Sequence, residues 1–266
     1  MYQSIATEVD DSVGILTLNK AVRHNAMDGL LVKEISDGLI DLESDPRVRV
    51  IVLSSTGKSF CAGPDVNWIK RTAASADEER LDDSRDLAQM MSALYELSKP
   101  TIARVQGPAF GVGVGIVAAC DIAVGTYDAL FALTEVRFGI LPAVVSPYVL
   151  AAIGERNCRR YMLTAERFSA AEAYRMGLLH EIVPGEEQLD DAIGEIIDNL
   201  LKNGPHAQAE CKTLIRLIAG QPIDDSTIGE TIRCIGRARS SAEGHEGMQA
   251  FLEKRRPNWL TPGSST

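Results

Sequence analysis

The stretch Thr101-Ile-Ala-Arg-Val-Gln-Gly-Pro-Ala-Phe-Gly-Val-Gly-Val-Gly-Ile116 decides how the rest of the chain is interpreted. Its β-branched first part, residues 101–105, predicts a buried strand that ends at Gly107-Pro108. The small residues that follow predict a turn into a tightly packed helix. Glycines at alternate positions from Gly111 to Gly115 remove Cβ atoms, so backbone N–H groups at the helix start can approach a ligand carbonyl or anion.

One carboxylate follows this turn in an otherwise apolar neighbourhood. Glu135 lies twenty residues after Gly115, within Leu133-Thr-Glu-Val-Arg-Phe-Gly139. The combination of a donor turn and a lone carboxylate predicts a functional site. Two simpler interpretations stay open, because Glu135 can also serve as a charge at a helix start or as a partner for Arg137, and the alternate glycines can serve close helix packing alone.

Length, composition and charge restrict the class of protein. The chain has 266 residues, is 45% hydrophobic and carries a formal charge of −10, which allows a full core and argues against a nucleic-acid surface. Five cysteines, odd in number and without metal-binding spacing, predict reduced thiols and no metal site. The first residues lack the features of a signal peptide, and no apolar run is long enough to span a membrane. We therefore expect a cytoplasmic protein without membrane or nucleic-acid partners.

The order of strand and helix patterns predicts an α/β fold built from repeated units. A strand over 48–54, a small-residue turn and a helix from Val66 capped by Asp65 precede the same sequence of elements at 101–119. Such repetition is typical of stacked ββα turns. After Pro184-Gly185 the pattern is helical only. We place the boundary at residue 200, between a core over 1–200 and a helical region over 201–266 whose apolar stripes need a further packing partner.

Five segments, in one order along the chain, carry a family resemblance. They are Arg23-His-Asn-Ala-Met27, Phe60-Cys-Ala-Gly-Pro-Asp65, Gln106-Gly-Pro-Ala-Phe-Gly-Val-Gly-Val-Gly115, Ala119-Cys-Asp121, and Ser169-Ala-Ala-Glu172 with Gly177-Leu178. Together they resemble the enoyl-CoA hydratase/isomerase (crotonase) superfamily along essentially the whole chain. Segments 65–71, 133–148 and 250–259 look more particularly like bacterial 3-methylglutaconyl-CoA hydratases.

The resemblance implies a crotonase-like spiral of ββα turns with a C-terminal helical region that forms a homotrimer or a dimer of trimers. It also implies an acyl-CoA substrate, with coenzyme A as part of the substrate and no separate cofactor. The thioester oxygen would lie between backbone donors at position 64 and Val112, with Glu135 as the catalytic carboxylate. The implied substrate contacts are Arg23, His24, Ala26, Ala62, Pro64, Asp65, Val66, Asn67, Gly111 and Val112. The basic run Lys254-Arg255-Arg256 either ends a helix in solvent or reaches a neighbouring subunit's CoA phosphates.

Two departures from the family pattern fall on the reacting groups. Position 64 is proline, which has no N–H, so either the Asp65 N–H replaces that donor or the oxyanion hole has one donor. Hydratases of the family usually carry a first glutamate where this chain has Gly115. We expect an enoyl-CoA hydratase that adds water to a short or branched 2-enoyl-CoA with Glu135 as general acid and base. The alternatives are a Δ3-Δ2 enoyl-CoA isomerase and an acyl-CoA-binding protein with little catalysis.

Overall fold

The structure is a computed structural model that describes residues 2–260. It divides into two compact units. The first consists of residues up to Leu97 together with Thr101–Gly194, and the second of Ser98–Pro100 together with residues from Glu195 onward. The boundary expected at residue 200 falls within helix α7 (Glu186–Leu201). No helix among the described residues is both long and apolar enough to span a membrane.

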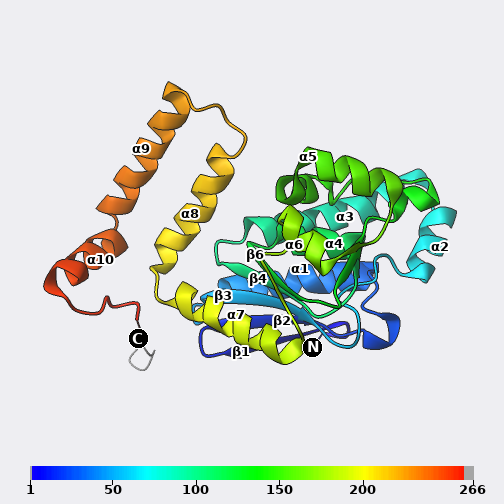
Figure 1. The fold of residues 1–266 in the computed structure, drawn as a ribbon, viewed down its shortest axis with the longest axis horizontal. Coiled ribbons are helices and arrows are strands. Elements are labelled where there is room, and N and C mark those ends of the chain that lie inside the picture. Colours follow the sequence, from blue (N-terminus) through cyan, green and yellow to red (C-terminus); the bar gives the residue numbers. More distant parts are fainter. Residues whose placement is uncertain (1, 261–266) are drawn as a thin grey trace. The chain divides into compact units, whose positions relative to one another are not determined.

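The first unit is built on a six-stranded sheet in the order β1-β2-β3-β4-β6-β9 (Figure 1). Its strands are β1 (Ile5–Asp10), β2 (Val13–Leu18), β3 (Val50–Ser55), β4 (Thr101–Val105), β6 (Ile122–Thr126) and β9 (Glu181–Val183). The first two form an antiparallel hairpin, and every later neighbour is parallel. Every residue of β3 is buried, as expected for a parallel strand covered on both faces.

A second, shorter sheet runs beside the helix starts. It contains β5 (Ala109–Phe110), β7 (Leu130–Ala132) and β8 (Phe168–Ser169), and single parallel bridges between Cys61 and Ala109 and between Met27 and Pro64 extend it. Each turn of the chain thus adds one strand to the large sheet, one extended segment to the small sheet and at least one helix. This repetition confirms the predicted spiral of ββα turns.

The helices of the first unit before α7 are α1 (Gly29–Ser44), α2 (Val66–Ala74), α3 (Asp77–Glu96), α4 (Val112–Ala119), α5 (Ser146–Thr164) and α6 (Ala170–Met176). Of these, α1, α4 and α6 contact strands of the large sheet, whereas α2 lies away from it (Figure 1). The predicted cap of α2 is confirmed, since Asp65 Oδ1 accepts from the Asn67 N–H at 2.7 Å. Helix α5 bends at Gly154, where φ is 73° and ψ is 161°.

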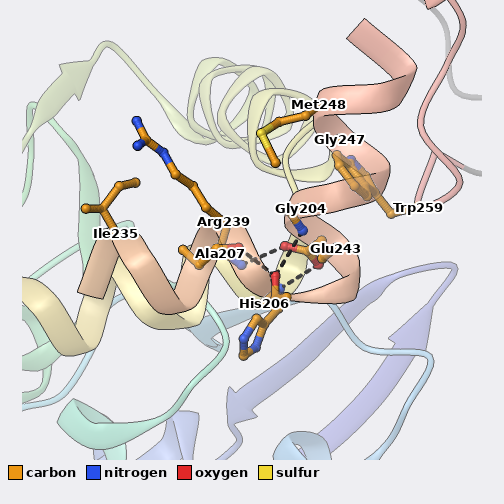
Figure 2. Close-up of a pocket in the computed structure, with 12 residues that line it drawn as sticks. Gly204, His206, Ala207, Ile235, Arg239, Glu243, Gly247, Met248 and Trp259 are labelled. Carbon is orange, nitrogen blue, oxygen red and sulfur yellow. Dashed lines mark hydrogen bonds between the residues drawn. The ribbon is translucent and has the colours of Figure 1, made fainter. Parts of the chain in front are cut away.

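The second unit is helical, with α8 (Pro205–Ile218), α9 (Asp225–Ser240) and α10 (Ala242–Glu253) after the end of α7. Glu243 accepts from the first N–H groups of α8, from Ala207 at 2.7 Å and from His206 at 3.0 Å (Figure 2). These bonds border a cavity of about 250 Å³ that Met248 and Trp259 help to line.

In the basic run Lys254-Arg255-Arg256 after α10, the central arginine forms hydrogen bonds with two glutamates. Arg255 donates to Glu246 at 2.6 Å and to Glu253 at 2.7 Å. The Arg255 hydrogen bond lowers the pKa of Glu246 to about 2. The Arg255 guanidinium is therefore used within its own unit, which favours the interpretation of this run as a helix end over that of a phosphate-binding group.

Candidate active site

Two segments that are distant in sequence run side by side at the start of the site. The Ala62 N–H donates to His24 O at 3.0 Å, and the Met27 N–H donates to Gly63 O at 2.8 Å. The Asp65 N–H closes the series by donating to Met27 O at 2.7 Å. These bonds bring together the first two segments that carry the family resemblance.

The third of those segments lies on the other side of the loop. The Cys61 N–H donates to Pro108 O at 3.2 Å, and the Phe110 N–H donates to Cys61 O at 2.8 Å. Gly63 lies against Phe110, since a Cβ at position 63 would be 3.3 Å from the Phe110 carbonyl oxygen. A Cβ at Gly111 would be 3.9 Å from Gly63 Cα. Positions 63–64 and 111–112 are therefore neighbours.

The start of α4 has the geometry of a donor turn. Gly111 has φ of 51° and ψ of −113°, a conformation that requires glycine, and its own N–H donates to Ala132 O at 2.9 Å. Gly111 has no side chain that could cap the helix. The first bond of the helical type reaches back from the Gly115 N–H to Gly111 O at 3.2 Å. Val112 is the first residue of α4, so its N–H comes before the first donor of a helical bond. It lies at the positive end of the helix dipole, where a negatively charged oxygen is stabilised.

Position 64 lies beside the start of α4 but has no backbone donor. In a parallel bridge, one residue bonds to the two neighbours of its partner, so Met27 pairs with the groups of Gly63 and Asp65. The backbone nitrogen of Pro64 consequently points away from Met27, and proline has no N–H to offer there. The Asp65 N–H is already bonded to Met27 O. The alternative in which Asp65 supplies the missing donor does not agree with this hydrogen bonding.

Glu135 lies at the start of a short 3₁₀ helix, η2 (Glu135–Phe138), and its carboxylate reaches Gly111. A Cβ at Gly111 would be 2.8 Å from Glu135 Oε1. Glu135 Oε2 is buried without a hydrogen-bond partner within residues 2–260. Burial raises the pKa of the Glu135 carboxyl above its ordinary value of 4.5, and a hydrogen bond from its own backbone partly opposes that rise.

The interpretation of Glu135 as a partner for Arg137 is not what the structure shows. The Arg137 guanidinium donates to Ala165 O at 2.7 Å. Glu135 is therefore a half-buried glutamate beside a donor turn, with one buried carboxylate oxygen and a raised pKa, a combination that makes it a candidate functional residue.

Position 115 is closed by apolar packing. A Cβ at Gly115 would lie 2.4 Å from Val145 Cγ1, 2.7 Å from Val145 Cβ and 3.3 Å from Met91 Cε. Val145 and Met91 are both buried. The Val145 side chain thus occupies the space that the family's usual glutamate would need at this position. No residue larger than glycine fits at position 115 without displacing Val145.

The implied substrate contacts lie on the neighbouring segments just described and on the first turn of α2. Arg23 pairs with Asp65 at 3.1 Å. Burial raises the pKa of Asp65, but hydrogen bonds from the Asn67 N–H and the Arg23 guanidinium outweigh it and hold that pKa below its ordinary value. His24 has φ of 52°, and its Nδ1 lies 3.1 Å from Ser59 Oγ.

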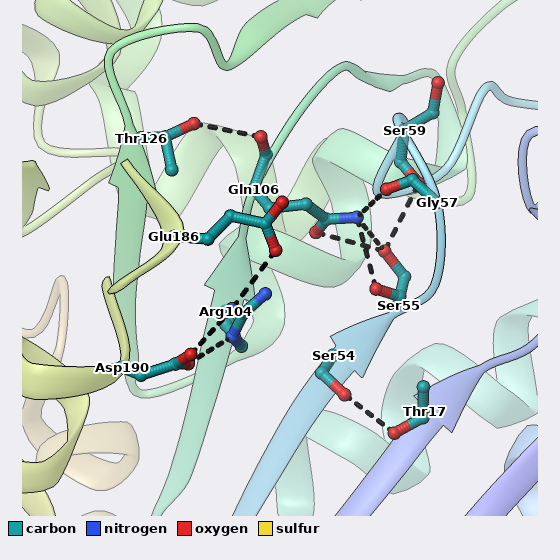
Figure 3. Close-up of polar contacts among 10 residues, drawn as sticks. All are labelled: Thr17, Ser54, Ser55, Gly57, Ser59, Arg104, Gln106, Thr126, Glu186 and Asp190. Atoms are coloured by element: carbon teal, nitrogen blue, oxygen red, sulfur yellow. Dashed lines mark hydrogen bonds and ion pairs between the residues drawn. The ribbon is translucent and has the colours of Figure 1, made fainter. Parts of the chain in front are cut away.

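Three residues of this region were not found from the sequence. They are Val145, which fills position 115, and the buried amides Asn25 and Gln106, which both donate to the turn 55–59. Figure 3 shows the bonds of Gln106. Asn25 and Gln106 lie inside segments that carry the family resemblance, which is the signal that could have identified them.

Comparisons with known proteins show which family the chain resembles. Residues 8–262 match the family described as enoyl-CoA hydratase/isomerase. The crystal structure of an enoyl-CoA hydratase from Shewanella pealeana is similar with a TM-score of 0.94 and 39% identity, over 97% of this chain and 96% of that chain.

Two curated relatives support the same family. A hydroxycinnamoyl-CoA hydratase-lyase of Pseudomonas fluorescens is 34% identical over 208 residues, which are 77% of this chain and 75% of the relative. A crotonyl-CoA hydratase of Syntrophomonas wolfei is 29% identical over 264 residues, which are 98% of this chain and 99% of the relative. The chain belongs to the enoyl-CoA hydratase/isomerase family.

Proposed function

We propose that the protein is an enoyl-CoA hydratase that adds water to a short or branched 2-enoyl-CoA. The observation that carries the proposal is the carboxylate of Glu135 beside Gly111, one oxygen of which is buried and has no partner among the described residues. The named relatives act on CoA thioesters, and their hydratase names favour water addition.

In this mechanism Glu135 moves one proton while water adds across the double bond. Glu135 removes a proton from water as the water oxygen bonds to the β-carbon, and the protonated carboxyl then delivers a proton to the α-carbon. Its raised pKa makes it a stronger base than an exposed glutamate.

Negative charge develops on the thioester oxygen between these two steps. The Val112 N–H and the start of α4 would stabilise that charge, and one such donor is worth roughly 3 to 4 kcal/mol. Because Pro64 cannot supply the second donor, the dipole of α4 would carry more of the stabilisation than in a two-donor site.

A second candidate is a Δ3-Δ2 enoyl-CoA isomerase, and the packing of Val145 at position 115 favours it. Glu135 would remove a proton from the α-carbon of a 3-enoyl thioester and return it to the γ-carbon, while the double bond moves towards the thioester. This reaction needs no bound water. A site whose second acid position is filled by apolar groups suits it.

The assembly, substrate range and location belong to the same proposal. Exposed apolar side chains on α8, α9 and α10, among them Ile215, Ile232 and Phe251, fit burial against further copies of this chain in a homotrimer or a dimer of trimers. Light scattering would measure that mass directly. The likeness to 3-methylglutaconyl-CoA hydratases makes a branched acyl group a substrate to test. We further propose a cytoplasmic enzyme that uses neither a metal nor a separate cofactor.

A panel of acyl-CoA thioesters, read by chromatography and mass, tests the proposal. Crotonyl-CoA and 3-methylglutaconyl-CoA should each gain the mass of one water. Conversion of a 3-enoyl-CoA without a change in mass, together with unreacted 2-enoyl-CoA, would establish the isomerase instead. Tight acyl-CoA binding without any turnover would overturn both and favour a CoA-binding protein.

A further inference from the structure

The turn over residues 55–59, which leads into the loop carrying Pro64, is bound by two amide side chains that the mechanism does not use. The first is Gln106 (Figure 3). Its Nε2 donates to Gly57 O at 3.0 Å and lies 2.8 Å from Ser55 Oγ and 3.2 Å from Ser55 O. Gln106 is buried directly after β4, and its backbone carbonyl accepts from Thr126 Oγ1 at 2.9 Å. The large sheet therefore fixes the position of Gln106.

The second amide binds two further carbonyls of the turn. Asn25 Nδ2 donates to Thr56 O and to Ser59 O, both at 2.8 Å, and Asn25 Oδ1 accepts from the Lys20 N–H at 2.8 Å. Asn25 is fully buried and has φ of 53°, a left-handed conformation that asparagine tolerates better than most residues. Asn25 also lies between two implied substrate contacts, His24 and Ala26.

The backbone approaches the turn closely as well. A Cβ at Gly107 would be 2.2 Å from Lys58 O, so only glycine allows β4 to end this close to the turn. The turn is therefore held by Asn25 from the segment that begins the site and by Gln106 from the segment that ends in the donor turn.

We propose that the side chains of Asn25 and Gln106 form a carboxamide clamp that positions the loop 60–65 for catalysis, an inference that rests on the proposed function. The loop 60–65 pairs with β5 through Cys61 and Phe110, and β5 leads directly to the Val112 N–H. With no N–H at position 64, the thioester oxygen depends on one backbone donor, so a small displacement of the loop changes its alignment. Misplacement by about 1 Å can cost roughly a hundredfold in rate.

The test replaces each amide by a carboxylate of the same shape. Asn25→Asp and Gln106→Glu remove the N–H donors, and Gln106→Met removes them without adding charge. Asn157→Asp is the matched control, because Asn157 Nδ2 also donates to a backbone carbonyl, that of Ile153 at 2.8 Å, but within α5. We expect kcat per folded molecule with crotonyl-CoA at pH 8 to fall at least about tenfold in the three clamp variants and less than about twofold in the control.

A purely structural role would lower the melting temperature without changing kcat per folded molecule or its pH profile. A positioning role predicts partial recovery of kcat at lower pH in Asn25→Asp and Gln106→Glu, because a protonated carboxyl can donate again, and none in Gln106→Met. It also predicts faster hydrogen exchange at the Cys61 and Phe110 amides. An unchanged kcat in the clamp variants would overturn the proposal. If the wild type turned over no thioester, the proposed function would fail, and unchanged exchange at those two amides would separately refute the clamp.

Discussion

Replacing Gly115 by alanine tests the packing that closes the second acid position. The new Cβ would meet Val145 at 2.4 and 2.7 Å, whereas real Cβ atoms essentially never lie closer than 3.0 Å. Val145 is 2% exposed and Met91 is 0% exposed, so neither side chain can move into solvent. Overpacking of this kind costs about 1 to 3 kcal/mol, and the gain of helix propensity offsets about 0.5 to 1 kcal/mol of it. We expect a net loss of about 1 to 2 kcal/mol.

The matched control is Gly194→Ala in α7, because nothing lies within 4 Å of a Cβ built at Gly194. This control should gain about 0.5 to 1 kcal/mol from helix propensity alone. Urea unfolding of wild type and both variants gives the free energies of unfolding to compare.

A double-mutant cycle then assigns the loss to one contact. Val145→Ala removes the nearer of the two clashing carbons, so Gly115→Ala should cost at least about 1 kcal/mol less in that background than in the wild type. The reasoning fails if Gly115→Ala stabilises the protein as Gly194→Ala does, or if its effect is the same with and without Val145.

Three further predictions concern single side chains. Burial raises the folded-state pKa of Glu135, so its contribution to stability is present below the unfolded value near 4.5 and is lost as pH rises through the folded pKa. Glu135→Gln should therefore raise the melting temperature at pH 8 and have little effect at pH 4, and a lower melting temperature at pH 8 would contradict the burial argument. Pro64→Ala restores an N–H on the side of the loop that faces α4, so kcat for hydration should rise, by up to about a hundredfold. An unchanged kcat in a folded variant would show that position 64 does not face the oxyanion. Glu243→Ala removes the acceptor for the first N–H groups of α8 and should lower the free energy of unfolding by about 0.5 to 2 kcal/mol, whereas Glu195→Ala, at an exposed position, should change it little. Equal effects of the two glutamate replacements would rule out the capping role.

Local hydrogen bonding explains which parts of the fold could be predicted. Asp65 caps α2 through a bond to a residue two positions later, and Ser169 accepts from the Glu172 N–H three positions later, so both patterns are visible in a short window of sequence. The strand at 101–105 was equally clear from its β-branched residues. The kink of α5 also has a local cause, because Gly154 adopts a positive φ that glycine tolerates without strain.

The chemistry of the site depends on contacts that no short window contains. The contact of Val145 with position 115 arises because α4 packs on α5, and the sequence showed only that the acid was absent. The bond from the Asp65 N–H to Met27 O joins residues from two different turns of the spiral, so the fate of that donor could not be inferred from the loop alone. The same holds for the two amides of the clamp.

The most direct test of the central claim compares the wild type with Glu135→Gln in the hydration of crotonyl-CoA, followed by loss of the enoyl-thioester absorbance. The matched comparison is the binding of the same thioester, which the amide replacement should preserve because it keeps the shape of the side chain. We predict that the wild type hydrates crotonyl-CoA and that Glu135→Gln loses about a hundredfold to ten-thousandfold in kcat, the usual contribution of a general acid and base. Equal rates in the two proteins would contradict the account.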